Sequence, residues 1–425
     1  MKRYSYILLV SLLMFTQAFA QKPSQKQSKK IILKGATVHV GNGTVLNNAS
    51  IAFENGKITE VSTSTINESG AEVIDAKGKH IYPGLICVDS RLGLEEIEAV
   101  RATLDYAEVG ELNPNIRSVI AYNTDSKILP TVRSNGILLA LSVPEGGIIP
   151  GTSSLMKLDG WNWEDAAYKM DVATQLNWPS IRIRNAWWAP PADEQRKQSA
   201  ENMAMIRRFF DEAKAYAQLD KPASTNLKFE AMKQIFNGSR KLFISAASAK
   251  EITSSVLFAE SYGIKPVILG AQEAYMVSDF LKEHNVPVIY TNPHSLPANE
   301  DDDIDMPYKT AKILKDKGVL YALSINGSWQ QRNLPFLAGT TAAYGLSKEE
   351  ALQSITLNAA KILGVDKTTG SLEVGKDANI IISEGDVLDM RTSQITKAYI
   401  QGASIDLDNK QKELYRTYLE KYELK

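Results

Sequence analysis

The sequence predicts an α/β fold, a (β/α)8 TIM barrel with a small β-sandwich domain built from both chain ends. Three observations favour this fold. From about residue 82 to residue 364, short apolar runs alternate with longer helical runs, which is typical of a parallel sheet with helices outside it. Residues 31–81 and 365–407 have strand character at the two ends. The chain is also long enough for one large domain and a smaller one.

The first twenty residues predict a secretory signal peptide. Lys2 and Arg3 precede an apolar stretch at residues 6–15, and residues 18–20 (AFA) match a small-x-small cleavage pattern. The apolar stretch is shorter than the roughly twenty residues that span a bilayer. We therefore expect an exported protein, periplasmic or secreted after cleavage; an uncleaved membrane anchor is the alternative.

The rest of the chain is predicted to consist of a linker, the two domains and a terminal helix. Residues 21–30 are polar and without periodicity, which indicates a solvated linker. In residues 31–81, the Asn55-Gly56 pair between two strand-like runs predicts a primed hairpin turn. Residues 82–364 form the predicted barrel; a doubly wound open sheet is the alternative, but no G-x-G-x-x-G motif opens its first strand–helix unit. Residues 408–425 have the pattern of a terminal helix.

Charge and cysteine content exclude several classes of function. Lys and Arg number 48 and Asp and Glu 49, so the chain has no electrostatic footprint for nucleic acid or for an acidic membrane surface. The single cysteine, Cys87, excludes an internal disulfide. Because Cys87 lies in an apolar segment, we interpret it as a small buried hydrophobe; a nucleophile is the alternative.

Three motifs occur in an order that one family requires. Residues 81–86 (IYPGLI) match the entry to the first barrel strand of amidohydrolases, and residues 345–364 match the last barrel helix. Residues 370–379 (GSLEVGKDAN) match the segment where the chain re-enters the smaller domain. The chain therefore resembles the amidohydrolase superfamily, nearest to its imidazolonepropionase-like subgroup. That resemblance implies a hydrolase acting on carbon–nitrogen bonds other than peptide bonds, with a zinc or dinuclear metal centre at the barrel mouth.

The metal ligands that the resemblance implies are replaced in this sequence. The H-x-H pair of the first strand falls on Asp89 and Arg91, and the histidines that end strands five and six fall on Ser245 and Gly270. The aspartate of strand eight, a metal ligand and general base in the family, falls on Asn326. A guanidinium offers only donors, and a neutral amide cannot take a proton from water. We therefore expect no bound metal and no zinc cofactor.

The histidine content supports the same expectation. The chain has four histidines: His39 in the β opening, His80 just before the barrel, His284 after a helix, and His294. Of these, His294 alone is expected on a loop at the C-terminal face of the barrel. A shift of alignment by one residue therefore cannot rebuild a histidine-rich centre.

The residues that replace the ligands predict a polar pocket with three possible roles. The predicted pocket residues are Asp89, Arg91, Ser245, Gly270, Asn326 and Arg332. In a structural role, Arg91 pairs with a carboxylate and fills the space of the metals. In a binding role, Arg91 and Arg332 hold a small anionic ligand. In a catalytic role, Asp89 or His294 acts as a base without a metal.

Two classes of function follow from these roles. The first is a pseudoenzyme, a ligand-binding protein or a partner subunit, present as a homo-oligomer or paired with a metal-competent relative. The second is a hydrolase acting on the C–N bonds of small amides, cyclic amides or peptides, as the resemblance alone implies. Metal content together with amidase activity separates the two classes.

Overall fold

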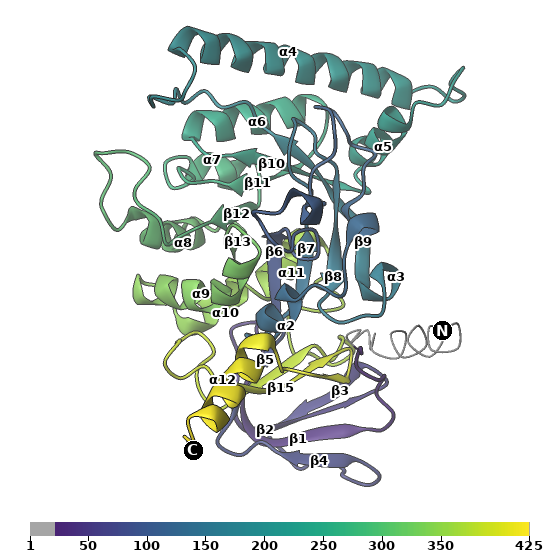
Figure 1. The fold of residues 1–425 in the computed structure, drawn as a ribbon, viewed down its shortest axis with the longest axis vertical. Coiled ribbons are helices and arrows are strands. Elements are labelled where there is room, and N and C mark those ends of the chain that lie inside the picture. The colour runs from purple at the N-terminus through teal and green to yellow at the C-terminus, as the bar shows by residue number, and fades with distance from the viewer. Residues whose placement is uncertain (1–21, 425) are drawn as a thin grey trace, which may run out of the picture.

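The computed structural model describes residues 22–424, which form a barrel domain and a sheet domain arranged along the long axis of the molecule (Figure 1). The sheet domain lies at the bottom of this view and contains strands from both chain ends. The predicted fold class is therefore confirmed. The predicted signal peptide lies outside the described residues. Among the described helices, none has both the length and the apolar character needed to cross a membrane.

Hydrogen bonds join both chain ends into one eight-stranded sheet, ordered β16-β15-β14-β5-β1-β2-β3, with β4 beside β1. Asn55 and Gly56 have φ of 52° and 78°, the left-handed backbone that the predicted primed turn requires. β5 pairs with β14, so the two chain ends share one apolar core. The strands are β1 (Ile31–His39), β2 (Val45–Glu54), β3 (Lys57–Ser62), β4 (Glu72–Asp75), β5 (His80–Pro83), β14 (Ile380–Ser383), β15 (Ile395–Ile400) and β16 (Ala403–Ile405).

Eight further strands form the barrel in the order β13-β12-β11-β10-β9-β8-β7-β6. The prediction of an all-parallel sheet is wrong at β8, which runs antiparallel to both β7 and β9. The segment 143–151 between β7 and β8 contains no helix, and a parallel pair needs a longer crossover. The strands are β6 (Leu85–Ser90), β7 (Ile137–Ser142), β8 (Thr152–Lys157), β9 (Ala167–Asn177), β10 (Lys241–Ala246), β11 (Pro266–Gly270), β12 (Val288–Thr291) and β13 (Tyr321–Ser324).

Most helices lie around these strands, and the longest, α4, crosses the top of Figure 1, whereas α12 lies at the level of the sheet domain. The α-helices are α2 (Ile128–Arg133), α3 (Trp163–Ala166), α4 (Ala192–Ala217), α5 (Leu227–Phe236), α6 (Ala249–Ser261), α7 (Ser278–Glu283), α8 (Met306–Asp316), α9 (Leu334–Ala343), α10 (Lys348–Ser354), α11 (Leu357–Leu363) and α12 (Lys410–Lys421). Short 3-10 helices lie at η1 (Arg101–Thr103), η2 (Ser118–Ala121) and η3 (Trp329–Asn333). The segment predicted as the terminal helix contains α12.

The segment predicted as a solvated linker has no helix or strand in its described part, yet it contacts both domains. Pro23 is buried, and the backbone N–H of Ser24 donates to Asp159 Oδ2 at 3.0 Å. Gln27 donates through Nε2 to the carbonyl of Phe53 at 2.8 Å and accepts through Oε1 from the N–H of Gly56 at 2.9 Å. These bonds satisfy backbone groups at the β2–β3 turn, so this segment is ordered by its contacts.

Alternation along the barrel strands separates an apolar layer from a polar one. Ala173, Phe243 and Ile289 belong to one buried apolar cluster that also includes residues of α11. Because side chains two residues apart share a face of a strand, the next residues on that face are Gln175, Ser245 and Thr291. The polar layer therefore stands directly beyond the apolar one, at the C-terminal ends of the strands.

Candidate functional site

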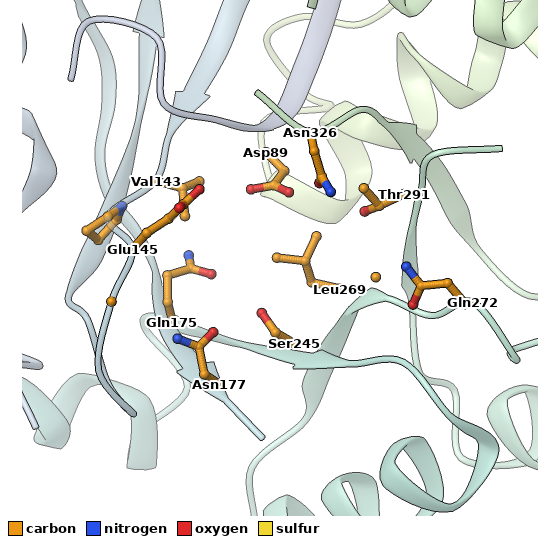
Figure 2. Close-up of a pocket in the computed structure, with 13 residues that line it drawn as sticks. Asp89, Val143, Glu145, Gln175, Asn177, Ser245, Leu269, Gln272, Thr291 and Asn326 are labelled. Atoms are coloured by element: carbon orange, nitrogen blue, oxygen red, sulfur yellow. The ribbon is translucent and has the colours of Figure 1, made fainter. Parts of the chain in front are cut away.

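A cavity of about 310 Å³ lies at the C-terminal ends of the barrel strands. In Figure 2, Asp89, Gln175, Ser245, Thr291 and Asn326 surround a shared hollow and come from different strands and strand ends. Catalytic sites of barrels lie at this end, where strand-end residues and loops converge. The cavity is lined by Asp89, Val143, Pro144, Glu145, Gly146, Gln175, Asn177, Ser245, Leu269, Gly270, Gln272, Thr291 and Asn326.

Four of the six predicted pocket residues line this cavity: Asp89, Ser245, Gly270 and Asn326. One buried side chain fixes the backbone at Asp89 and next to Asn326. Gln331, on η3, donates through Nε2 to the carbonyl oxygens of Asp89 at 3.1 Å and Ile325 at 2.6 Å. Gln331 is fully buried, so the end of β6 and the start of the loop after β13 are held together at a fixed distance.

Arg91 and Arg332 do not line the cavity, which corrects their predicted place in the pocket. Arg91 Nε lies 3.0 Å from Glu95 Oε2 and 3.4 Å from Glu145 Oε1, and its guanidinium covers the ring of Tyr106 at 4.9 Å. Arg332 donates through Nη1 to the carbonyl of Trp329 at 2.6 Å. Both arginines thus have partners within the protein: Arg91 pairs with Glu95 of its own loop and with Glu145 of the loop after β7, and Arg332 bonds to its own short helix.

His294, a predicted candidate base, lies in a different place from Asp89. Its Nε2 is 2.6 Å from Thr340 Oγ1, and it lines a separate cavity of about 610 Å³ beside α9. Burial lowers the pKa of His294. Asp89 and His294 therefore cannot act together on one substrate atom.

Asp89 is the half-buried carboxylate at the centre of the site. Burial, followed by the charge of Glu145, raises its pKa to about 7, against the opposing effect of Arg91. Burial also raises the pKa of Glu145, again against the attraction of Arg91. Within the described part of the chain, no side chain donates a hydrogen bond to the Asp89 carboxylate. Asp89 can therefore exchange a proton near neutral pH.

Two nearly fully buried polar atoms at the cavity have no partner among the described residues. They are Gln175 Oε1 and Thr291 Oγ1, on side chains 2% and 3% exposed. Gln272 Oε1, also in the lining, is unpaired as well. Since buried polar atoms are nearly always hydrogen-bonded, such atoms facing a cavity indicate a site for water or a ligand.

These residues do not make up the histidine-rich centre that the resemblance implies. No imidazole lines the cavity, and its carboxylates are those of Asp89 and Glu145. Across residues 22–424, no group of three or more His, Cys, Asp or Glu side chains could hold a metal ion. Gly270 has φ of 94°, which side chains other than glycine rarely adopt, so a histidine at the end of β11 would be strained. That no metal is bound stays a prediction.

Five polar residues of the cavity were not predicted from the sequence: Glu145, Asn177, Gln175, Gln272 and Thr291. Gln175 and Asn177 alternate at the end of an apolar run, which is a strand-end signal that could have found them. Thr291 directly follows a predicted strand. Glu145 and Gln272 lie on loops, where no periodic pattern marks the direction of a side chain.

Comparison with known proteins identifies the family. The family model described as "Amidohydrolase family" matches residues 166–418. An imidazolonepropionase of Fusobacterium nucleatum is 25% identical over 79% of this chain and 85% of its own length. A 5'-deoxyadenosine deaminase of Methanobrevibacter smithii is 23% identical over 78% of this chain and 79% of its own length.

A solved structure agrees with this relationship. An amidohydrolase from Thermotoga maritima MSB8 has a TM-score of 0.78 and 24% identity, over 88% of this chain and 99% of its own. At that identity the likeness bears on the fold alone. The family, by contrast, follows from the family model, which covers more than half of the chain. This chain belongs to the amidohydrolase family and is imidazolonepropionase-like within it.

Proposed function

We propose that this chain is an amidohydrolase-family protein whose barrel mouth works without the metal centre of the family, as the ligand-binding site of a pseudoenzyme. One observation carries the proposal: the cavity at the strand ends is lined by Asp89, Ser245, Gly270 and Asn326 and by no imidazole. Zinc in catalytic sites takes nitrogen, sulfur or carboxylate ligands, usually three from the protein. An amide, a hydroxyl and a glycine do not replace them.

The backbone at the cavity supports the same proposal. Gly270 stands where the family has a histidine, and its φ of 94° belongs to the region that favours glycine. Asn326 stands where the family has its general base, and an amide has no basic lone pair for a water proton. Both the ligand set and the proton acceptor of the metal mechanism have therefore changed together.

Activity assays test this proposal. The purified chain is incubated with small linear and cyclic amides, with and without added Zn²⁺, Mn²⁺ or Co²⁺, beside the Fusobacterium nucleatum imidazolonepropionase as a working control. We expect no turnover that depends on added metal and is removed by a chelator. Metal-stimulated hydrolysis of any of these amides by this chain would overturn the proposal.

A second function, hydrolysis of C–N bonds without a metal, is favoured by one observation. Burial raises the pKa of Asp89 to about 7, which suits a general base or acid near neutral pH. In this case Asp89 accepts the proton of an attacking water, while the amides of the lining contact the substrate. This function would be favoured by turnover that resists chelators and is lost in Asp89→Asn. The control is Glu111→Gln, a charge-matched change at an exposed residue outside the lining, which should keep the turnover.

Export and assembly are proposed on the sequence pattern and the family resemblance. We propose that the chain is exported and cleaved after Ala20, and that it assembles as a homo-oligomer or with a metal-competent relative. Mass spectrometry of the protein from its native cells is expected to find Gln21 at the N-terminus. Peptides from residues 1–20 in the mature protein would contradict export with cleavage, and a monomer in size-exclusion chromatography with light scattering, without a co-purifying relative, would contradict assembly.

A further inference from the structure

The cavity at the barrel mouth is rich in acceptors and contains no cationic side chain. Among the described residues that line it, Asp89 and Glu145 contribute carboxylates, and Gln175 and Gln272 present unpaired Oε1 atoms. No lysine, arginine or histidine belongs to the lining. A ligand that satisfies these atoms has to bring hydrogen-bond donors.

The orientation of the Gln175 amide follows from its neighbours. Ser153 Oγ donates its proton to the carbonyl of Ala173 at 3.1 Å, so towards Gln175 this hydroxyl can only accept. Gln175 Nε2 donates to it at 2.9 Å, which leaves Oε1 as the atom without a partner. A reversed amide would set an acceptor against an acceptor. Gln175 therefore presents a fixed, nearly fully buried acceptor at the cavity.

The charge around the cavity is only partly balanced. The guanidinium of Arg91 pairs with two carboxylates, those of Glu145 and Glu95. The carboxylate of Asp89 is a third negative group nearby. The side chain of Arg91 is 18% exposed, against 51% for Glu145, so the arginine lies behind the carboxylate that lines the cavity. A negative field in a half-enclosed site attracts a positive ligand.

We propose that this cavity binds a small organic cation, whose ammonium or guanidinium group lies between Asp89 and Glu145 and donates a further hydrogen bond to Gln175 Oε1. This inference rests on the proposed function, because a metal ion in the same cavity would take the same carboxylates. Val143, Pro144 and Leu269 line the rest of the cavity and suit a short apolar body. The volume of about 310 Å³ suits a small molecule.

This ligand differs from the anionic one predicted from the sequence. That prediction depended on Arg91 and Arg332 being free, but both have protein partners and neither lines the cavity. The cation binds more tightly as the pH rises, since a protonated Asp89 has no charge to offer. The charged or titratable groups around Asp89 are Cys87 and Arg91 on its own segment and Glu145 from the loop after β7, with Glu95 beyond Arg91.

Calorimetric titration with matched probes tests the inference. The cationic probes are butane-1,4-diamine, agmatine and methylguanidine, and the controls are butane-1,4-diol and succinate. We expect at least one cation to bind at about pH 8 and neither control to do so. Asp89→Asn and Glu145→Gln should each weaken binding about tenfold or more, since each removes a charge-assisted hydrogen bond. Glu111→Gln should leave it unchanged, and lowering the pH to about 5.5 should weaken it.

Several results would overturn the inference: no binding of any of the three cations to the folded protein, tighter binding of succinate, or affinity that neither cavity variant changes. Two independent variants are used because either one could fail to fold, which circular dichroism reports. The metal content of the same preparation separates the two proposals. A metal-rich preparation contradicts the proposed function, whereas a metal-free one that binds no cation contradicts only this inference.

Discussion

Replacing Asp89 with asparagine is expected to stabilise the protein, and increasingly so as the pH rises. Burial raises the pKa of Asp89 from an ordinary value of 3.8 to about 7. A carboxyl whose pKa is higher in the folded state keeps its proton longer there than in the unfolded chain. Its contribution to stability therefore decreases as the pH rises from 3.8 to about 7, and is constant above that.

The magnitude follows from the same two values. The difference between 3.8 and about 7, at about 1.4 kcal/mol for each pH unit, gives about 4 kcal/mol as an upper bound. Relaxation around the charge reduces this, so we expect the Asn variant to gain roughly 2–4 kcal/mol relative to the wild type between about pH 4 and pH 8. The neutral amide has a similar shape and needs no charge to be buried.

Urea denaturation of both proteins across that pH range measures the effect, with Glu111→Gln as a control at an exposed carboxylate. We expect the stability difference between Asp89→Asn and the wild type to grow with pH and to level off near pH 7. A difference that does not change with pH would refute the raised pKa. A variant less stable than the wild type at pH 8 would refute the argument further, because it would mean that a bound cation or metal stabilises the Asp89 charge.

Three further changes test the local structure. Gly270→Ala is expected to destabilise the protein by about 1–2 kcal/mol, because the φ of 94° strains any other residue; unchanged stability in urea denaturation would contradict this. Asp159→Ala leaves the guanidinium of Arg133, 2% exposed, without its ion pair, and should cost about 3–5 kcal/mol in the same assay; a loss below about 1 kcal/mol would contradict a buried pair. Burial and the neighbouring His39 lower the pKa of His80 below 6.5, so the unfolded chain takes up this proton first and stability falls as the pH drops through 6.5. His80→Gln should reduce that loss in a pH series of thermal melts, and an identical pH profile would count against it.

Much of the fold could be predicted because its signals are local. The strand alternation at the two ends, the Asn55-Gly56 turn and the motifs at residues 81–86 and 370–379 each depend on neighbours in sequence. The antiparallel direction of β8 does not depend on neighbouring residues alone. It follows from how the short segment 143–151 is packed. Helix α4 was not predicted because its first half is largely exposed and lacks the apolar stripe that its second half has.

The candidate site could be predicted only in part, for a related reason. Asp89, Ser245 and Asn326 were predicted from the family resemblance, which places the family's ligands at strand ends, and all three line the cavity. Arg91 follows a strand, but its direction is set by Glu95 and Glu145. The pair with Glu145 joins two loops that are far apart in sequence, so no pattern along the chain reports it.

The absence of histidine from the cavity lining is the feature on which the proposed function depends. The zinc centre that the family resemblance implies uses several imidazoles at strand ends, and the lining holds none. The remaining carboxylates, Asp89 and Glu145, share the cation of Arg91 with Glu95. The absence of a metal centre at the barrel mouth is therefore the central claim, and the ligand proposal depends on it.

Metal analysis tests that claim most directly. The mature protein is expressed without chelators, purified, dialysed against trace zinc and measured by inductively coupled plasma mass spectrometry. We expect well below one metal ion per chain. One or two tightly held metal ions per chain would contradict it and would favour a metal-dependent hydrolase.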